Sequence, residues 1–533
     1  MISLAIFVAL SIALPRWLRV AQREHYIPGR VAYISYLWIR VLRRNVVLVF
    51  ALVLWTLGLP LASQWVLSSR IQQESLATLA VAAPVVIFVI VWPLGLRWRG
   101  SEKSKLVWTP RLRRLAAIST TCNAVVAAGV WALAQVPPLV GFAPSLALLS
   151  PVYVDVALLL SKPVEARLSA RFVERARRRI DQVKPTIIGI TGSFGKTSTK
   201  QYLTTLLSSK YYTVASPGSF NNLLGLSRTV NDVLADGTEI FVAEMGTYGP
   251  GEIRRIAEFF PPKIACITSI GDVHLERMKS RANIARAKSE ILATATGVVL
   301  CIDYPELNEL AHSCKAEGKE VITVSTSDSE KPDVLVANSG QAIVLSYRGK
   351  KVGRLESLDG HAGNIGCAVG MALIAGLSLE EVSGQLANLT AVAHRAEVIV
   401  RPDGPAIIDD TYNSNPQGAL SALEKGSKLA GEAGGILYVV TPGMIELGRS
   451  QFDENVALGR QAVKLGSRLF IVGRINRRAL LKGATAGRQE IRGVAPAQPV
   501  LADSRQDAAT QAYAVATFRD VILFENDLPD HYP

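Results

Sequence analysis

The sequence has few cysteines, and none are paired at a spacing typical of metal sites. The 533 residues contain five cysteines without a CxxC motif, at Cys122, Cys266, Cys301, Cys314 and Cys367. Neither a zinc ribbon nor a disulfide framework is indicated, because both need closely spaced or paired cysteines. We therefore expect reduced, buried cysteines in a chain long enough for three or four domains.

Acidic residues are fewer than basic ones, which first suggests an anionic partner. The chain holds 58 lysines and arginines against 44 aspartates and glutamates, a formal net charge of +14. Such an excess is compatible with nucleic-acid binding. Many of the basic residues, however, flank apolar stretches in the first 160 residues. We therefore expect no nucleic-acid partner.

Apolar stretches occupy residues 2–15, 45–68, 75–96, 115–135 and 140–160. The last four approach the roughly 20 residues that a helix needs to cross a bilayer. The first is short and interrupted by Pro15, and its basic residues follow the apolar core, whereas a signal peptide carries them before it. We predict a transmembrane domain of about five helices over residues 1–160. Buried helices of a soluble domain are the alternative.

The basic residues between these stretches predict the orientation. Residues 16–44 and 97–114 are rich in arginine and lysine, whereas 68–75 hold only Arg70 and 135–141 hold none. The positive-inside rule then predicts an outside N-terminus, a multi-pass chain in a bacterial cytoplasmic membrane, and residue 161 in the cytoplasm. Asp155 is the one ionisable residue within a predicted span, which is weak evidence for transport.

Residues 161–184 are basic and follow a helical period. We predict an amphipathic linker helix that lies on anionic membrane lipid. A solvated connector is an equally good interpretation.

Residues 187–200, IIGITGSFGKTSTK, predict a nucleotide phosphate loop. A β-branched strand leads into a turn with Gly192 and Gly195, and a helix then opens with Lys196 and Thr197. Glycines let backbone N–H groups surround an anion, the lysine adds charge, and the hydroxyl can bind Mg²⁺. The TGxxGKT spacing is shorter than GxxxxGK[ST]. A plain glycine turn before a helix is the alternative.

From residue 185 onward, predicted strands and helices alternate, which is typical of a doubly wound parallel sheet. Glu244 ends one predicted strand and His274 follows another, so both are expected at the edge where ligands bind. A second alternation begins near residue 400 with AIIDD, ILYVV, RLFIVG, QPVLA and DVILFE. We therefore predict domains at 185–390 and 391–533 after the linker.

Seven motifs occur in one order: TGSFGKTSTK, SPGSFNNLLGLSRTV, EMGTYGPGEI, ITSIGDVHLERMKS with ANIARAKSEI, HRAEVI, IIDDTYNSNP and GMIELG. This series resembles the Mur ligase family, closest to its D-alanyl-D-alanine-adding branch, over about residues 185–450. The resemblance implies a P-loop central ATPase domain and a Rossmann-like C-terminal domain, with a hinge near 391–400. It also implies ATP-dependent amide-bond formation between a carboxylate and an amine through an acyl phosphate.

The resemblance also implies the site residues. Phosphate contacts are expected from Thr191, Gly192, Ser193, Gly195, Lys196, Thr197 and Ser198. Further nucleotide contacts are expected from Asn364 near adenine, Arg395 at the γ-phosphate, Asp410 at the ribose, Tyr412 and Asn415. Two Mg²⁺ ions are expected on Thr197, Glu244, His274 and Lys288, with Lys288 as a carbamate. The catalytic set is Lys196, Glu244, His274 and Lys288, and the substrate side is Asn221 and Asn222.

The sequence departs from the family at several positions. Membrane helices are predicted where members carry a UDP-sugar-binding domain, and the sequence ends DVILFENDLPDHYP in place of a basic Lys-Gly-Ser turn. In the adenine motif HNxxNA, Asn364 is kept, whereas Gly363 and Cys367 replace the His and the second Asn.

These departures suggest a carboxylate substrate at the bilayer, either a lipid-linked envelope precursor or an exported polymer. An amino acid or dipeptide would supply the amine, and envelope-synthesis or export proteins would be partners. The alternatives are a poly-γ-glutamate-type membrane ligase and a non-catalytic nucleotide-binding scaffold. An ATP-driven transporter ranks lower, because no second nucleotide motif is present.

Overall fold

The structure is a computed structural model that divides into two compact units. An N-terminal unit comprises Met1–Leu168 with Leu528–Pro533, and a second unit comprises Ser169–Asp527. The structure describes residues 2–51, 54, 96, 105–133, 149–218, 220–247, 249–273, 275–339, 342–356, 362–390, 397–400, 403–411, 415–491, 496–528 and 531–533.

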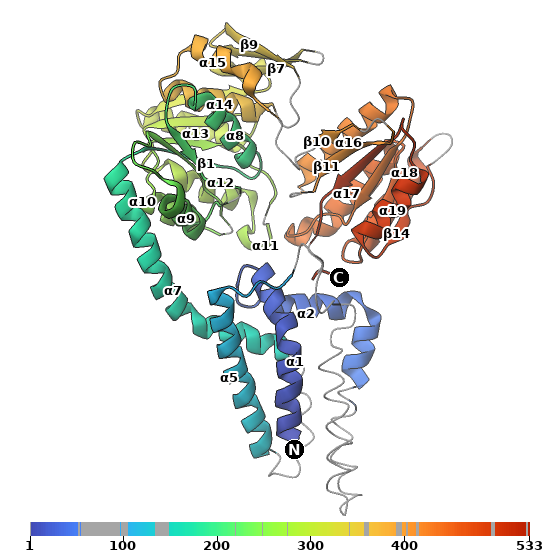
Figure 1. Ribbon diagram of the computed structural model, residues 1–533. Coiled ribbons are helices and arrows are strands. Elements are labelled where there is room, and N and C mark those ends of the chain that lie inside the picture. The colour runs from blue at the N-terminus through green and yellow to red at the C-terminus, as the bar shows by residue number, and fades with distance from the viewer. Residues whose placement is uncertain are drawn as a thin grey trace, which may run out of the picture. The chain divides into compact units, whose positions relative to one another are not determined.

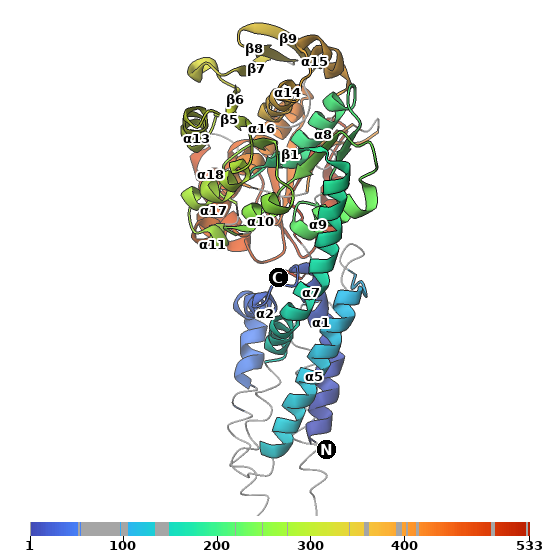
Figure 2. The same ribbon diagram turned by 90° about the vertical axis from the view of Figure 1, so that its left-hand side faces the viewer.

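The N-terminal unit is helical where it is described. Its helices include α1 (Ile2–Arg23), α2 (Arg30–Val41), α5 (Pro110–Leu133) and the first part of α7 (Ser150–Val183). Helices α1 and α5 pack side by side (Figures 1 and 2). The expected interruption at Pro15 is wrong, because α1 runs through this proline to Arg23. A proline removes one backbone hydrogen bond and kinks a helix, but here residues 16–21 are all buried, and this packing keeps the chain helical.

One described helix is long and apolar enough to cross a membrane by length and composition, namely α5 over Pro110–Ala132. It coincides with the predicted stretch 115–135. Most of stretches 45–68 and 75–96, and the first half of 140–160, lie outside the described residues. The number of spans therefore stays a prediction.

Asp155 has a structural role in the N-terminal unit. Its carboxylate accepts hydrogen bonds from the backbone N–H groups of Val31, at 3.4 Å, and Ala32, at 2.8 Å. These groups lie in the first turn of α2, where N–H groups have no partner within the helix. Asp155 of α7 thus caps α2, which accounts for this carboxylate without a transported ion.

The segment after the last strand, Leu528–Pro533, belongs to the N-terminal unit, where its residues contact Glu24. The Glu24 carboxylate bonds to Nε2 of His531 at 2.8 Å and to Oη of Tyr532 at 3.1 Å, and it pairs with the Arg30 guanidinium. The indole N–H of Trp38 donates to the carbonyl of His531 at 2.9 Å. Burial alone would raise the pKa of Glu24, but the hydrogen bonds and charges of His531 and Arg30 lower it to about 2.

Helix α7 is continuous from the last predicted span through most of the predicted linker. Its second part is amphipathic, because Val173, Ala176 and Ile180 are buried while basic side chains between them are exposed. The boundary between the two units falls inside this helix. The helical part of the linker prediction therefore agrees with the structure.

The first sheet of the second unit has nine strands: β1 (Thr186–Thr191), β2 (Thr213–Ala215), β3 (Ile240–Glu244), β4 (Ile264–Ile267), β5 (Gly297–Cys301), β6 (Glu320–Ser325), β7 (Val334–Ser339), β8 (Ala342–Tyr347) and β9 (Lys350–Glu356). Their order is β2-β3-β1-β4-β5-β6-β7-β8-β9. Strands β2 to β7 are parallel, and β8 and β9 add antiparallel. The predicted doubly wound sheet is thus present, with an added hairpin at one edge.

The helices of this domain are α8 (Lys196–Leu207), α9 (Leu223–Val233), α10 (Glu252–Phe259), α11 (Leu275–Met278), α12 (Arg281–Ser289), α13 (Pro305–Ala316), α14 (Gly363–Ile374) and α15 (Leu379–Gln385). Helix α14 packs against α8 and against strands β4 to β7. Its first ten residues are all buried. This packing places the start of α14 beside the loop that precedes α8 (Figure 1).

The second sheet follows the order β10-β11-β15-β12-β13-β14. Its strands are β10 (Glu397–Ile399), β11 (Ala406–Asp410), β12 (Leu437–Thr441), β13 (Arg468–Val472), β14 (Val500–Ala502) and β15 (Val521–Glu525). All are parallel except β10. Helices α16 (Pro416–Glu432), α17 (Gln451–Lys464), α18 (Arg477–Glu490) and α19 (Arg505–Val515) cover it. Five strands lie where their β-branched runs predicted them.

Candidate functional site

The loop between β1 and α8 has the geometry of an anion site. Gly195 is the N-cap of α8 with φ of 83°, and no described side chain caps the helix. A helix N-terminus exposes backbone N–H groups and the positive end of its dipole. A bound anion can therefore occupy the position that a capping side chain takes elsewhere.

Two glycines of this loop are required by close contacts. A Cβ atom on Gly192 would lie 2.0 Å from Oγ1 of Thr268, and one on Gly195 would lie 2.1 Å from Oδ1 of Asn364. No side chain fits at such distances. Asn364, at the buried start of α14, thus lies directly against the loop.

The shape of the loop is fixed by the segment that follows β4. The backbone N–H of Ser193 donates to the carbonyl of Ser269 at 3.0 Å, and the N–H of Phe194 donates to the Ser269 hydroxyl at 2.9 Å. The Ser193 hydroxyl bonds to the backbone of Gly271. The Phe194 ring packs edge-on against Tyr304, with centroids 6.0 Å apart. The loop is therefore held in shape by protein contacts.

Lys196 lies over the loop that it follows. Its ammonium donates to the carbonyl of Gly192 at 2.7 Å and to that of Ser193 at 3.4 Å. Lys288, buried on α12, is near enough to feel this charge. Burial and the charge of Lys196 together hold the pKa of the Lys288 amine well below its usual range.

Glu244 ends β3 beside this loop and is almost completely buried. Its Oε2 accepts from Oγ1 of Thr197 at 2.9 Å and from the ammonium of Lys200 at 3.0 Å. Its Oε1 accepts from the amide of Asn221 at 3.2 Å. Burial alone would raise the pKa of Glu244, but the charges of Lys200 and Lys196 hold it below its usual value.

These oxygens fit a magnesium ion. A carboxylate and a P-loop hydroxyl on adjacent segments are the hard oxygen ligands that Mg²⁺ prefers. Glu244 and Thr197 already meet at 2.9 Å, and the ammonium of Lys200 shows that a cation is accommodated there. Within the described part of the chain, no three His, Cys, Asp or Glu side chains gather. His274 lies outside the described residues, so the second predicted metal position is not defined.

The remaining predicted residues are placed individually. Ser198 is buried in the first turn of α8. Thr191 is buried at the end of β1, and its hydroxyl has no partner among the described residues. Asn222 accepts from the N–H of Gly225 and caps α9. Arg395 and Tyr412 lie outside the described residues.

Two predicted residues lie in the second sheet domain. Asp410 is the last residue of β11, and its carbonyl accepts from the N–H of Asn526 at 3.1 Å. Asn415 caps α16 by accepting from the N–H of Gly418 at 3.0 Å. Both lie at or just after the carboxyl end of a central parallel strand, where ligands bind in such sheets. Their ribose and nucleotide roles stay predictions.

Lys200 is a site residue that the sequence did not reveal. It follows Lys196 by four residues, so both side chains lie on one face of α8. This four-residue spacing is the sequence feature that could have identified Lys200 as a site residue. Its pairing with Glu244 depends on β3 lying beside the helix, which local sequence does not show.

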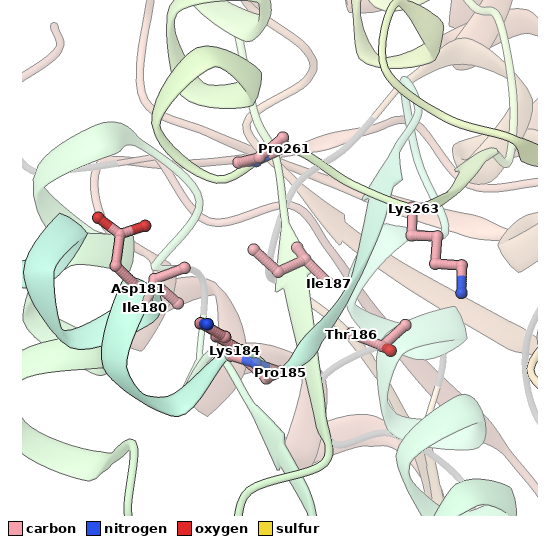
Figure 3. Close-up of a pocket in the computed structure, with 8 residues that line it drawn as sticks. All are labelled: Ile180, Asp181, Lys184, Pro185, Thr186, Ile187, Pro261 and Lys263. Carbon is pink, nitrogen blue, oxygen red and sulfur yellow. The ribbon is translucent and has the colours of Figure 1, made fainter.

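A surface pocket lies at the opposite end of β1. It is lined by Lys184, Thr186 and Lys263, among others. Figure 3 shows Ile187 between Asp181 on one side and Lys263 on the other. Because β1 begins at Thr186 and the phosphate loop follows its last residue, this pocket is separate from the candidate nucleotide site.

Comparison with known proteins agrees with this geometry. Residues 190–360 match the Mur ligase middle domain. The UDP-N-acetylmuramoyl-tripeptide--D-alanyl-D-alanine ligase of Mycobacterium leprae (strain TN) is 35% identical over 317 residues, covering 54% of this chain and 61% of that protein. The chain thus spans about three fifths of the length of the curated relatives it matches first.

Two solved structures share the fold. MurF from Acinetobacter baumannii has a TM-score of 0.55 and 25% identity, covering 67% of this chain and 77% of that chain. MurF from Thermotoga maritima in complex with ADP has a TM-score of 0.57 and 22% identity, covering 67% and 80%.

Proposed function

We propose that this chain, whose residues 190–360 are a Mur ligase middle domain and which resembles the MurF branch, is an ATP-dependent carboxylate–amine ligase. The observation that carries the proposal is the assembly of Lys196, Thr197 and Glu244 around the turn at Gly195. Phosphoryl transfer needs positioned positive charge more than covalent help from the protein. This assembly supplies it.

Lys196 and the start of α8 would hold the ATP phosphates. The ammonium now donates to the neutral carbonyl of Gly192. A phosphate oxygen carries negative charge and is a stronger acceptor, so bound ATP would take over this hydrogen bond. Asn364 lies against Gly195 and is therefore near enough to the loop to contact the nucleotide.

Thr197 and Glu244 would hold Mg²⁺, which supplies neutralisation of phosphate charge when bound. The charges of Lys200 and Lys196 outweigh the effect of burial and lower the pKa of Glu244, which favours the ionised carboxylate that Mg²⁺ needs as a ligand. The lowered pKa of Lys288 favours its neutral amine more than in an ordinary lysine. A neutral amine can add CO₂ to give a carbamate, so we propose that Lys288 acts as an anion at this site.

The reaction proceeds in two displacements. A substrate carboxylate oxygen attacks the γ-phosphorus of ATP, the bond to the bridging oxygen breaks, and ADP leaves. The amine nitrogen then attacks the carbonyl carbon of the acyl phosphate. The carbon–oxygen bond to phosphate breaks, the nitrogen loses a proton, and an amide and inorganic phosphate are formed.

The substrates are proposed from the relatives and from the N-terminal unit. The relatives are named for joining D-alanyl-D-alanine to a UDP-N-acetylmuramoyl-tripeptide, so an envelope peptide carboxylate and an amino acid or dipeptide amine are the expected classes. A helical unit containing an apolar helix, α5, precedes the ligase domains. A lipid-linked form of the carboxylate substrate would therefore be presented to this enzyme at the membrane.

The same helices support a membrane location, and the basic residues at 16–44 and 97–114 support a cytoplasmic position of the ligase domains. Helix α1 exposes Leu4, Val8 and Ile12 at four-residue spacing, and α5 exposes Val125 and Trp131. Such apolar side chains suit contact with lipid. Protease protection in spheroplasts checks the orientation: an N-terminal tag should be cleaved from outside, whereas the ligase domains should be cleaved only after lysis.

The deciding experiment is phosphate release by the detergent-purified chain with ATP and Mg²⁺. A panel of envelope carboxylates, UDP-linked and lipid-linked, is combined with amino acids and dipeptides. Lys196→Ala should abolish release. Lys210→Ala is the matched control, because Lys210 is partly exposed and pairs with Glu381 away from the site.

Release that needs both a carboxylate and an amine, and that Lys196→Ala removes, supports the ligase and identifies its substrates. Nucleotide binding without release for any pair would favour the scaffold alternative. Phosphate release that needs only glutamate as the amine and a glutamate polymer as the carboxylate would favour the poly-γ-glutamate alternative.

A further inference from the structure

Lys200 joins three segments of the candidate site. Its side chain is 6% exposed, and its ammonium donates to Oε2 of Glu244 at 3.0 Å. The same ammonium donates to the carbonyl of Gly218 at 2.6 Å. One buried charge thus connects α8, the end of β3 and the loop between β2 and α9, which is described at residues 216–218 and 220–222.

The carboxylate oxygen that Lys200 contacts is also the expected metal ligand. Thr197 donates to this same Oε2 at 2.9 Å. A magnesium ion lies only about 2.1 Å from its oxygen ligands, and at that position it would repel an ammonium bonded to the same oxygen. Metal and ammonium therefore compete for Glu244.

The β2–α9 loop contacts the end of β3 at three further points. The amide of Asn221 donates to Oε1 of Glu244 at 3.2 Å, and the Ser216 hydroxyl accepts from the Glu244 N–H at 3.2 Å. The N–H of Gly246, two residues beyond Glu244, donates to the carbonyl of Asn221 at 2.7 Å. The last two contacts involve the backbone of β3 and its following turn, so a change at the carboxylate reaches this loop through Asn221 and through Lys200 to Gly218.

We propose that Lys200 is a positioning residue that links occupancy of the metal site to the position of the β2–α9 loop at Gly218. Without metal, the ammonium neutralises Glu244 and holds the loop through Gly218. A metal ion bound by Glu244 and Thr197 would displace the Lys200 ammonium from Oε2. The hydrogen bond from this ammonium to the Gly218 carbonyl would then weaken, and the loop on the predicted substrate side would become more mobile. This inference rests on the proposed function for the identity of the metal site.

Lys200→Met in the full-length chain tests the link, with Lys210→Met as matched control. The first readout is amide hydrogen exchange of the peptide covering residues 213–226, with and without Mg²⁺ and ADP. In the native chain, metal should accelerate exchange of this loop. In Lys200→Met, exchange should be fast without metal and should not change when metal is added.

The second readout is the affinity for Mn²⁺ in saturating ADP, measured by electron paramagnetic resonance. Removing the competing charge should tighten Mn²⁺ binding by about tenfold. Lys200→Arg keeps the charge and should bind Mn²⁺ as the native chain does. Loss of folding in Lys200→Met would weaken Mn²⁺ binding, so it cannot imitate the expected tightening.

Native exchange and native Mn²⁺ affinity in Lys200→Met would overturn the proposal. Weaker Mn²⁺ binding in this variant would also overturn it, because Lys200 would then build the metal site instead of competing for it. Neither readout requires turnover. A chain with metal-dependent loop exchange but no phosphate release would therefore contradict the proposed function alone.

Discussion

At the scale of single residues, the phosphate loop combines backbone strain with close packing. Gly195 has φ of 83°, and its Cα faces the amide of Asn364 so closely that any side chain would collide with it. Gly237 has the same φ, but nothing lies within 4 Å of where its Cβ would be. A substitution at Gly237 therefore measures the free-energy cost of the backbone conformation alone, whereas one at Gly195 adds the cost of the steric contact with Asn364.

Gly195→Ala should lose nucleotide binding, whereas Gly237→Ala should keep it. Both substitutions should cost roughly 1–2 kcal/mol for placing a side chain in the left-handed region. Only Gly195→Ala should also displace Asn364 and reduce ADP affinity by at least about tenfold. Titration calorimetry with ADP checks this, and equal affinities for the two variants would contradict it.

Lys288 gives a second test at this scale. Burial and the charge of Lys196 lower the pKa of the Lys288 amine, which favours the neutral form that reacts with CO₂. We expect ¹³C-labelled bicarbonate to give a carbamate resonance in the native chain and none in Lys288→Met. A resonance that persists in Lys288→Met would show that the carbamate forms on another amine. Absence of the resonance in the native chain would contradict the proposed carbamate on Lys288.

At the scale of elements, helix ends decide several local arrangements. Asn222 starts α9, Ser378 and Glu381 form a capping box on α15, and Asn415 starts α16. These caps act within a few residues and are visible in sequence. Asp155 differs, because it caps α2 from a helix more than a hundred residues later.

Asp155→Ala should destabilise the N-terminal unit by about 1 kcal/mol, the usual cost of losing a cap. Asp155→Asn retains an acceptor oxygen and should lose less. Thermal unfolding in detergent, followed by circular dichroism, gives the comparison. Equal stability of all three chains, together with altered ion flux, would restore the transport interpretation.

The sequence predicted β1 to β4 of the first sheet and five of the six strands of the second, because their β-branched runs are continuous. It did not predict β5, β6, α9 or the hairpin edge of β7, β8 and β9, although the apolar–polar alternation around Gly349 is a hairpin signal. In the site, Thr197 contacts Glu244 because strand order brings the loop and the strand end together, while the roles of the predicted site residues stay predictions. The sequence did not show that Lys200 pairs with Glu244 or that Asp155 caps α2, because each pair lies on segments that are distant in sequence.

At the scale of the whole molecule, the contact of Glu24 with His531 and Arg30 gives a pH dependence. The pKa of Glu24 is about 2 in the folded chain, against 4.5 ordinarily. Because the folded value is lower, this stabilisation is fully present above pH 4.5 and is lost as the pH falls toward 2. The shift corresponds to about 3 kcal/mol.

Glu24→Gln should therefore lower the unfolding free energy of the N-terminal unit at pH 7 by up to about 3 kcal/mol, and the difference should shrink toward pH 3. Glu174→Gln is the control and should leave the N-terminal unit unchanged, because Glu174 forms an exposed ion pair with Arg178 in the second unit. Urea unfolding at both pH values measures the difference. A difference that stays constant with pH would show that the carboxylate charge is not responsible.

The contact between Glu24 and His531 joins residues that are 507 positions apart. During synthesis, Glu24 and Arg30 leave the ribosome long before His531 and Tyr532 exist. The N-terminal unit, made first, is therefore completed last, after both sheet domains have been translated. A ribosome that stalls within either sheet domain leaves the buried Glu24 carboxylate without His531, so this contact forms only after residue 531 has been translated.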